Sequence, residues 1–321
     1  MKASGVAALS AAIYVGIAGS PALAETLPIS GVYPARTDGA VGARVIALES
    51  FGGDQGAEVN FSLNDALESV RIDGENWFVI VPTSGDDVDA VLRGSASSDV
   101  SYRRVDDKKK TKCEEKDDNG KCIRRRVTYV QCREMIVELR PSIRLIAVDG
   151  TELYGERDMI GEKRRYCADG YEPSSRAILE KLVSDFTRQV RYDLAPVQRS
   201  QGIRVMESRK NLNKKDRKPF RNAVKLTKTD VSAACSAFAA LEANNPQHPS
   251  VLYNIGLCAE GLDDFEKAAD YYNRALAVEP GKDYPTRGLQ RISDRARADM
   301  QLEEHFGPVE SEADIEADTA N

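Results

Sequence analysis

Short apolar runs in the first part of the chain predict buried strands on either side of a helix. The runs at residues 45–48 and 77–81 are rich in β-branched or aromatic residues, and a glycine-rich turn or a proline follows each. Residues 25–40 show no regular pattern, so we expect a loop there. Between the two runs, helical spacing connects the apolar residues Phe61, Leu63, Ala66, Leu67 and Val70.

The middle of the chain predicts antiparallel strands followed by a long helix. We expect strands at residues 90–94, 127–130, 135–139, 143–148 and 153–157. The last two flank Asp149-Gly150, which is typical of a two-residue hairpin turn. A helix then opens at Pro173-Ser174-Ser175, and residues 203–205 add a final strand. The apolar residues of this helix recur at every fourth position, at Ile178, Leu182, Phe186 and Val190.

This order of elements resembles the CsgG-like family of envelope proteins, which includes the curli-secretion pore and the lipoprotein activators of peptidoglycan synthases. The resemblance covers residues 41–205 and rests on the element order and on the Val-Asp-Gly-Thr-Glu-Leu hairpin. It implies an α+β domain with a mixed sheet and flanking helices. Such a domain would bind partner proteins in the cell envelope and would catalyse no reaction. The chain departs from the family by lacking a lipid-anchored cysteine and by carrying an insertion at residues 103–126, which argues against a pore.

The C-terminal part contains the pattern of a tetratricopeptide repeat at residues 249–282. The matching positions are Leu252, Ile255, Gly256, Ala259, Leu262, Phe265, Ala268, Tyr272, Ala275, Leu276 and Pro280. The small residues let two helices approach, and the proline ends the second helix. A degenerate copy precedes this repeat and a capping helix around Leu289–Ala296 follows it, which predicts a short all-α array over residues 215–300. A helical hairpin without a binding role is the alternative.

The repeat geometry predicts a partner-binding groove. First helices of successive repeats line a concave surface, so we expect six residues to face or border it: Tyr253, Asn254, Leu257, Glu260, Arg221 and Lys225. Residues 301–321 contain seven acids and no Lys or Arg. We expect a disordered acidic tail that occupies or guards the groove. A tail that only solubilises the chain is the alternative.

The N-terminus predicts export. Residues 1–24 combine Lys2, an apolar run and the small-x-small sequence Ala22-Leu23-Ala24, as in a cleaved signal peptide. Glycines and a proline interrupt the run before the ~20 residues that a membrane span needs. Cleavage after Ala24 would leave Glu25 at the mature N-terminus, without a lipid-modified cysteine. We therefore expect a periplasmic protein.

The six cysteines predict disulfides rather than a metal site. An even number in an exported chain favours disulfides, although six cysteines allow fifteen pairings. Proximity along the predicted elements favours the pairs Cys113–Cys122, Cys132–Cys167 and Cys235–Cys258. Zinc is disfavoured because no Cys-x2-Cys spacing occurs and the two histidines lie far from the first four cysteines.

The insertion at residues 103–126 is strongly basic. It holds eleven Lys or Arg against six acids, with a turn at Asp118-Asn119-Gly120. We expect a protruding hairpin that binds an anionic partner such as lipid head groups, a cell-wall polymer or an acidic protein face. A solvated loop without a partner is the alternative. Because the net charge of the chain is −6, a nucleic-acid partner is not expected.

Catalytic and cofactor motifs are not recognisable in the sequence. The glycine-rich segment 52–56 lacks the Gly-Lys-Ser/Thr that holds phosphates, and no histidine falls within the predicted α/β domain. We therefore predict no enzyme, cofactor or metal, and a periplasmic adaptor that binds envelope proteins. The alternatives are a carboxylate-dependent cell-wall enzyme and a structural subunit of an outer-membrane assembly.

Overall fold

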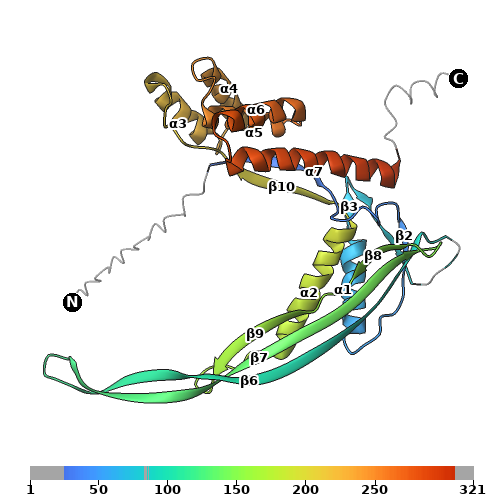
Figure 1. Ribbon diagram of the computed structural model, residues 1–321, viewed down its shortest axis with the longest axis vertical. Helices are drawn as coiled ribbons and strands as arrows, with labels where there is room; N and C mark the ends of the chain where they lie inside the picture. Colours follow the sequence, from blue (N-terminus) through green and yellow to red (C-terminus); the bar gives the residue numbers. More distant parts are fainter. Residues whose placement is uncertain (1–24, 83–84, 86, 308–321) are drawn as a thin grey trace, which may run out of the picture. The chain divides into compact units, whose positions relative to one another are not determined.

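The computed structural model describes residues 25–82, 85 and 87–307 and divides the chain into two compact units (Figure 1). Among the described residues, the α/β unit comprises Ser30–Gln201 and residues 289–307. The helical unit comprises residues 25–29 and Gly202–Gly288. The predicted signal peptide and most of the predicted acidic tail, residues 308–321, lie outside the described residues.

A mixed sheet forms the α/β unit, as the sequence predicts. The strand order is β5-β2-β6-β7-β8, and β9 pairs with another part of β7. The strands are β2 (Val45–Leu48), β5 (Val79–Val81), β6 (Ala90–Lys116), β7 (Cys122–Ala147), β8 (Glu152–Glu156) and β9 (Ile160–Cys167). Strand β2 pairs in parallel with β5 and β6, and all other pairs in this sheet are antiparallel. The predicted hairpin at Asp149-Gly150 connects β7 to β8.

Helices α1 (Gly56–Glu68) and α2 (Ser175–Leu194) pack on the sheet and enclose the core. The predicted start of α2 is confirmed, because the Ser174 side chain accepts a hydrogen bond from the Ala177 amide. Helix α1 begins five residues earlier than Phe61, whose side chain is exposed. The buried row is instead Val59, Leu63 and Leu67, an i, i+4 series that leaves Phe61 on the other side.

Strands β6 and β7 are much longer than the sequence predicts. They pair from Ala90 opposite Ala147 to the tip, with register shifts after Val105 and near Cys113, so residues 103–126 extend the strands rather than interrupt them. Pro141 does not end β7, because it lies between the parts of β7 that pair with β9 and with β8. Pro141 lies opposite Ala96 of β6, but the other side of β7 has no strand partner at this position, and such an open side tolerates a residue that has no N–H.

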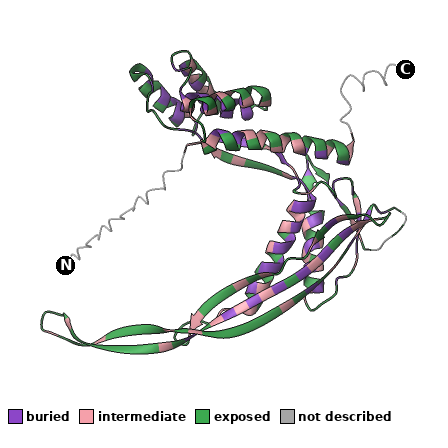
Figure 2. Cartoon of the chain, in the orientation of Figure 1, coloured by how far each residue is buried: buried purple, intermediate pink, exposed green. Residues whose placement is uncertain are grey.

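The outer part of this hairpin, residues 105–131, has only one strand pairing, and we call it the distal arm. Strand β9 reaches β7 at Cys132, and beyond that point β6 and β7 pair only with each other. None of the residues of the distal arm is buried, as Figure 2 shows. An isolated two-stranded ribbon is at best marginally stable, so the arm depends on its tip and base for order.

The segment before the sheet is a strand, which corrects the predicted loop at residues 25–40. Strand β1 (Thr26–Tyr33) pairs with β10 (Val197–Arg204), which also extends the predicted strand at residues 203–205. Leu27 and Ile29 alternate with exposed neighbours in β1. Pro28 and Gly31 hide this short alternation in the sequence. A small hairpin of β3 (Arg71–Ile72) and β4 (Glu75–Asn76) completes the strands.

Two helical hairpins form the helical unit. Its elements are η1 (Lys214–Asp216), α3 (Arg217–Leu226), α4 (Val231–Glu242), α5 (Pro249–Glu260) and α6 (Phe265–Val278), followed by the start of α7 (Asp283–Phe306). Gly256 lets α5 and α6 approach, because a Cβ there would lie 2.8 Å from the Tyr272 ring. Phe220 and Phe238 are buried between α3 and α4.

Helix α7 packs against the α/β unit from Leu289 onward, which corrects both the predicted capping helix and the predicted start of the tail at residue 301. Arg297 pairs with Asp38 at 2.8 Å, and the Gln301 carboxamide accepts a hydrogen bond from the Ala35 amide at 2.8 Å. The His305 ring stacks on Trp77 at a centroid distance of 3.6 Å. The helix continues because these side chains are buried or paired within the unit.

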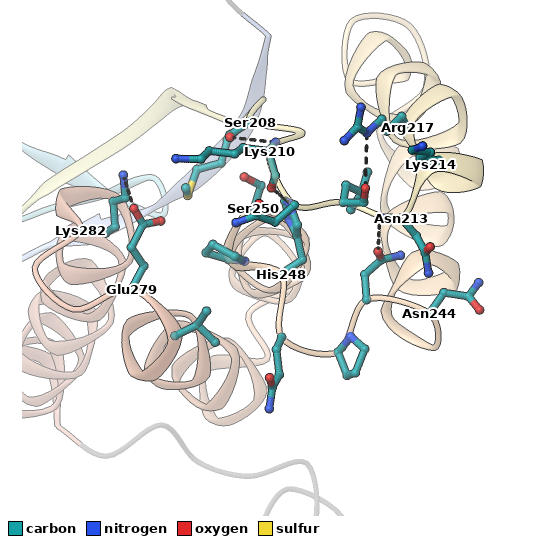
Figure 3. A pocket seen from close by; sticks show the side chains of 18 residues that line it. Ser208, Lys210, Asn213, Lys214, Arg217, Asn244, His248, Ser250, Glu279 and Lys282 are labelled. Atoms are coloured by element: carbon teal, nitrogen blue, oxygen red, sulfur yellow. Dashed lines mark hydrogen bonds and ion pairs between the residues drawn. The ribbon is translucent and has the colours of Figure 1, made fainter.

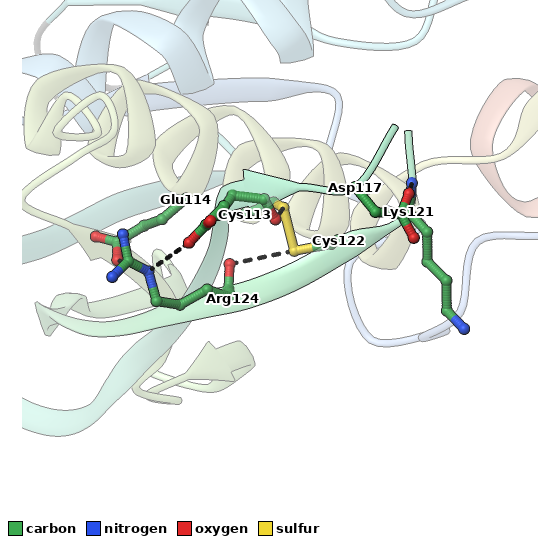
Figure 4. Close-up of a disulfide and its surroundings, with 7 residues drawn as sticks. Cys113, Glu114, Asp117, Lys121, Cys122 and Arg124 are labelled. Atoms are coloured by element: carbon green, nitrogen blue, oxygen red, sulfur yellow. Dashed lines mark hydrogen bonds and ion pairs between the residues drawn. A yellow bond between two sulfur atoms is a disulfide. The ribbon is translucent and has the colours of Figure 1, made fainter. Parts of the chain in front are cut away.

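The structure contains three disulfides, in the pairs that the sequence predicts. Cys113–Cys122 joins the two strands at the tip of the distal arm (Figure 4). Cys132–Cys167 joins β7 to β9 at directly opposite positions, where Cys132 is buried. Cys235–Cys258 joins α4 to α5 and so links the two helical hairpins.

We expect Cys132→Ala/Cys167→Ala to lower the free energy of unfolding by about 3 kcal/mol, because this bond links core strands across 35 residues. The matched change Cys113→Ala/Cys122→Ala removes a bond across nine residues in an arm without buried side chains, and we expect a loss below about 1 kcal/mol. Urea denaturation followed by the fluorescence of Trp77, the single tryptophan, measures both. Equal losses for the two variants would contradict this assignment.

Candidate functional site

Helix α5, the first helix of the sequence-predicted repeat, is buried along almost its whole length. Tyr253, Asn254, Leu257 and Glu260 are each at most 2% exposed. The prediction that these four residues face an open groove is therefore wrong. Arg221 and Lys225 on α3, predicted to border the groove, are exposed, but the structure does not bring them to an open surface with the other four.

The expected groove face is filled by the chain's own segment at Arg204–Met206. The Asn254 carboxamide accepts a hydrogen bond from the Met206 amide at 2.8 Å and donates one to the Met206 carbonyl at 2.9 Å. The Tyr253 hydroxyl donates to the Arg204 carbonyl at 3.3 Å. These residues hold an extended backbone as they would hold a bound peptide. The sequence could not show this, because the contacts span 48 and 49 residues.

Buried polar contacts also join the helices of the helical unit to one another. Glu260 accepts a hydrogen bond from the Tyr272 hydroxyl at 2.5 Å. Glu242 of α4 accepts from Tyr271 at 2.7 Å and from Arg274 at 2.5 Å. Burial raises the pKa of Glu242, but the hydrogen bonds from Tyr271 and Arg274 act more strongly and hold it below its ordinary value. Glu260 and Glu242 therefore support the packing of α4, α5 and α6.

A polar cleft of about 950 Å³ opens at the amino end of α5, within the helical unit (Figure 3). Its walls come from the segment before α3, the loop between α4 and α5, and the end of α6 with the following turn. The residues that line it are Met206, Ser208, Lys210, Asn211, Leu212, Asn213, Lys214, Arg217, Asn244, Asn245, Pro246, Gln247, His248, Pro249, Ser250, Val278, Glu279 and Lys282. Side chains that donate hydrogen bonds therefore dominate the lining.

Hydrogen bonds fix the walls of the cleft. The Asn245 carboxamide donates to the buried Asp216 carboxylate at 2.9 Å and accepts from the Asn213 amide at 3.1 Å. His248 Nε2 lies 2.9 Å from the Lys210 carbonyl. A carbonyl only accepts hydrogen bonds, so Nε2 carries the hydrogen. The cleft is therefore held open by contacts between its walls.

The distal arm is the second surface with distinctive chemistry. Directly opposite residues share a face, so Lys109 and Tyr129 lie beside Thr111 and Val127 on one face. Tyr129 is 66% exposed. On the opposite face Lys108 and Lys110 pair with Asp169, and Lys110 holds the pKa of that carboxyl below its usual range. The face with Tyr129 therefore combines an exposed aromatic ring with Lys109, which forms no ion pair with a described residue.

The described residues contain no group of three His, Cys, Asp or Glu side chains placed to hold a metal ion. His305 is buried between the carbonyl oxygens of Val41, at 2.5 Å, and Trp77, at 2.8 Å. Burial lowers its pKa, and the two carbonyls act in the opposite direction. We assign His305 to the anchoring of α7.

Comparison with known proteins identifies one family within the chain. The model of the tetratricopeptide repeat matches residues 249–282, which contain α5 and α6. The helical unit contains a tetratricopeptide repeat. Search of the curated proteins gives no match. A crystal structure of the rare lipoprotein B from Shewanella oneidensis aligns with this chain at 15% sequence identity and a TM-score of 0.23. The alignment covers 47% of this chain and 90% of the lipoprotein chain. This likeness is too weak to bear on the fold or the function.

The residues at the floor and rim of the cleft are the ones that sequence reasoning missed. His248 reads as a surface residue in a loop, yet it is 5% exposed. Pro249 in the first turn of α5 marks the helix start, which is the only local signal. Lys210 and His248 are 38 residues apart, and only the path of the chain brings them together.

We expect Asn254→Ala to lower the free energy of unfolding of the helical unit by about 2–3 kcal/mol, because it leaves both backbone groups of buried Met206 without partners. Asn273→Ala, at an exposed position on α6, is the matched control and should change stability by less than about 0.5 kcal/mol. Urea denaturation followed by far-ultraviolet circular dichroism measures both. A similar small effect of the two changes would show that the segment at Met206 does not hold α5.

We expect stability to fall on mild acidification. Burial lowers the pKa of His248, whose Nε2 donates to one carbonyl and whose Nδ1 has no partner among the described residues that would accept a second hydrogen. Below about pH 6.5 the unfolded chain therefore binds protons that the folded chain does not, so stability is full above that pH and falls as the pH drops through it. Urea midpoints between about pH 7.5 and 5.5 test this, and His248→Gln should flatten the slope. A rise in stability towards acid pH would contradict the prediction.

Proposed function

We propose that this protein is a non-enzymatic adaptor of the cell envelope that binds other proteins through its helical unit and its distal arm. The observation that supports this most directly is the tetratricopeptide repeat of α5 and α6, a type of repeat that builds binding surfaces. The groove face of α5 is filled by the chain itself, so binding has to use the surfaces that remain open in this unit.

An extracytoplasmic location is consistent with the three disulfides, because such bonds persist in oxidising compartments. Across the described residues, every helix is too short or too polar to cross a bilayer. The proposal includes export to the periplasm, with cleavage after Ala24, on the grounds of the sequence at residues 1–24.

We propose further that the α/β unit is a CsgG-like domain. The supporting features are the order of strand, helix and strand at β2, α1 and β5, the antiparallel strands β6 to β8 with the Asp149-Gly150 turn, and the long helix α2. In this proposal the unit serves as a scaffold for the distal arm. The helices α1 and α2 and the sheet enclose a continuous core, so the base of the arm is rigid.

The distal arm is proposed to contact an anionic partner surface. Lys109 and Arg125 form no ion pair with a described residue and lie on the face that exposes Tyr129 and Val127. An aromatic side chain on the same face as cations is suited to an interface, since it contributes apolar contact area while the cations select for acidic groups. The disulfide at the tip restricts the motion of the free end.

Site-specific photo-crosslinking in intact cells tests the proposed function. A crosslinking phenylalanine analogue at Tyr129 and, separately, at exposed Gln247 beside the cleft should capture other envelope proteins. The same analogue at exposed Glu68, at the end of α1, is the matched control and should capture none. Mass spectrometry of the products identifies the partners.

Three outcomes would overturn or redirect the proposal. Failure of both test positions to capture another protein would contradict an adaptor. Crosslinks only between copies of this chain would favour a structural subunit of an assembly. Loss of cellular function on a single Asp or Glu change, with crosslinks unchanged, would favour a carboxylate-dependent cell-wall enzyme.

A further inference from the structure

The floor of the cleft holds two buried polar atoms that lack a hydrogen-bond partner among the described residues. They are His248 Nδ1 and Ser250 Oγ, on residues that are 5% and 0% exposed. Buried polar atoms in folded proteins almost always have a partner, so an unsatisfied pair that lines one cleft calls for a group that is bound there. Figure 3 shows both residues among the side chains that line it.

The chemistry of the missing group follows from the protonation of His248. Its Nε2 donates to the Lys210 carbonyl, and burial lowers its pKa, so the ring is neutral and Nδ1 is an acceptor. The Ser250 hydroxyl can donate. The complementary group therefore offers one hydrogen-bond donor and one acceptor, which a peptide backbone supplies through its N–H and C=O.

The rim of the cleft selects for acidic groups. Lys210, Lys214 and Arg217 line it and form no ion pair with a described carboxylate, whereas Lys282 pairs with Glu279 at 2.9 Å. Helix α5 begins here without a side-chain cap, so its positive end adds to the potential. The buried Asp216 carboxylate lowers this positive potential, and it already accepts a hydrogen bond from the Asn245 carboxamide.

We propose that this cleft binds an extended acidic peptide segment of a partner protein. A backbone unit of the segment donates to His248 Nδ1 and accepts from Ser250, and its carboxylates lie against Lys214 and Arg217. A free sulfate ion satisfies the cations but offers no hydrogen to His248 Nδ1. The proposal rests on the proposed function and specifies the chemistry of the partner. It also places peptide binding at the amino end of α5 and not on the groove face that the sequence predicts.

Peptide binding to the full chain without residues 1–24 tests the proposal. The probe is a fluorescein-labelled peptide of alternating Glu and Ala, with a Gln–Ala peptide as its neutral analogue, and fluorescence anisotropy measures affinity. We expect Lys214→Gln/Arg217→Gln to weaken the acidic peptide by at least about tenfold. Lys218→Gln/Arg221→Gln removes the same charge from exposed positions of α3 outside the cleft and should change affinity less than about threefold.

Ser250→Ala separates a ligand-binding role from a structural one. The hydroxyl has no partner in the free protein, so its removal should leave the urea midpoint unchanged or raise it, while it weakens the peptide about threefold to tenfold. Ser232→Ala, at an exposed position of α4, is the control and should change neither. A lower midpoint with unchanged peptide affinity would show that Ser250 binds only an internal water, and this would overturn the proposal.

Further results would test whether the cleft binds an acidic peptide. Equal affinity for the acidic and neutral peptides, or full competition by inorganic phosphate alone, would overturn the assignment of an acidic peptide. Crosslinks from Tyr129 in cells with no peptide binding at the cleft would reject the cleft and leave the adaptor function standing. Peptide binding at the cleft without any crosslink in cells would support the cleft as a peptide site and reject the adaptor function.

Discussion

The pairing of the Asn254 carboxamide with both backbone groups of Met206 determines much of the helical unit. One side chain in the middle of α5 satisfies an amide and a carbonyl that would otherwise be buried without partners. The pairing therefore keeps the extended segment on α5, and Tyr253 extends the contact to Arg204. Because this segment covers the helix, the repeat cannot present the groove that its sequence indicates.

The open cleft is a consequence of the same path of the chain. After Met206 the segment turns around the amino end of α5, where the Lys210 carbonyl bonds to His248. The turn brings Lys210 and the start of α3 beside the loop between α4 and α5, and Asn245 joins these walls through Asp216 and Asn213. The segment that closes one surface of the repeat therefore forms a wall of another.

The sequence predicts local periodicity well and long-range contacts poorly. The i, i+4 stripe of α2, the Asp149-Gly150 turn and the helices of residues 249–282 are set by neighbouring residues, and each is present. The cysteine pairs were also predictable, since each lies within or between adjacent elements. The filled groove depends on contacts across 48 residues, and the packing of α7 on contacts across about 260, which no local pattern encodes.

The distribution of charge explains why two basic surfaces can act in an acidic chain. The net charge is −6, so the long-range field does not attract acidic partners. At physiological salt, however, charges beyond about 8 Å are largely screened, and a ligand at a surface responds to the groups it touches. In the proposed function, the cations at Lys214 and Arg217 in the cleft, and at Lys109 and Arg125 on the arm, therefore act on the groups that touch them. Each proposed surface would select its partner by contact rather than by attraction from a distance.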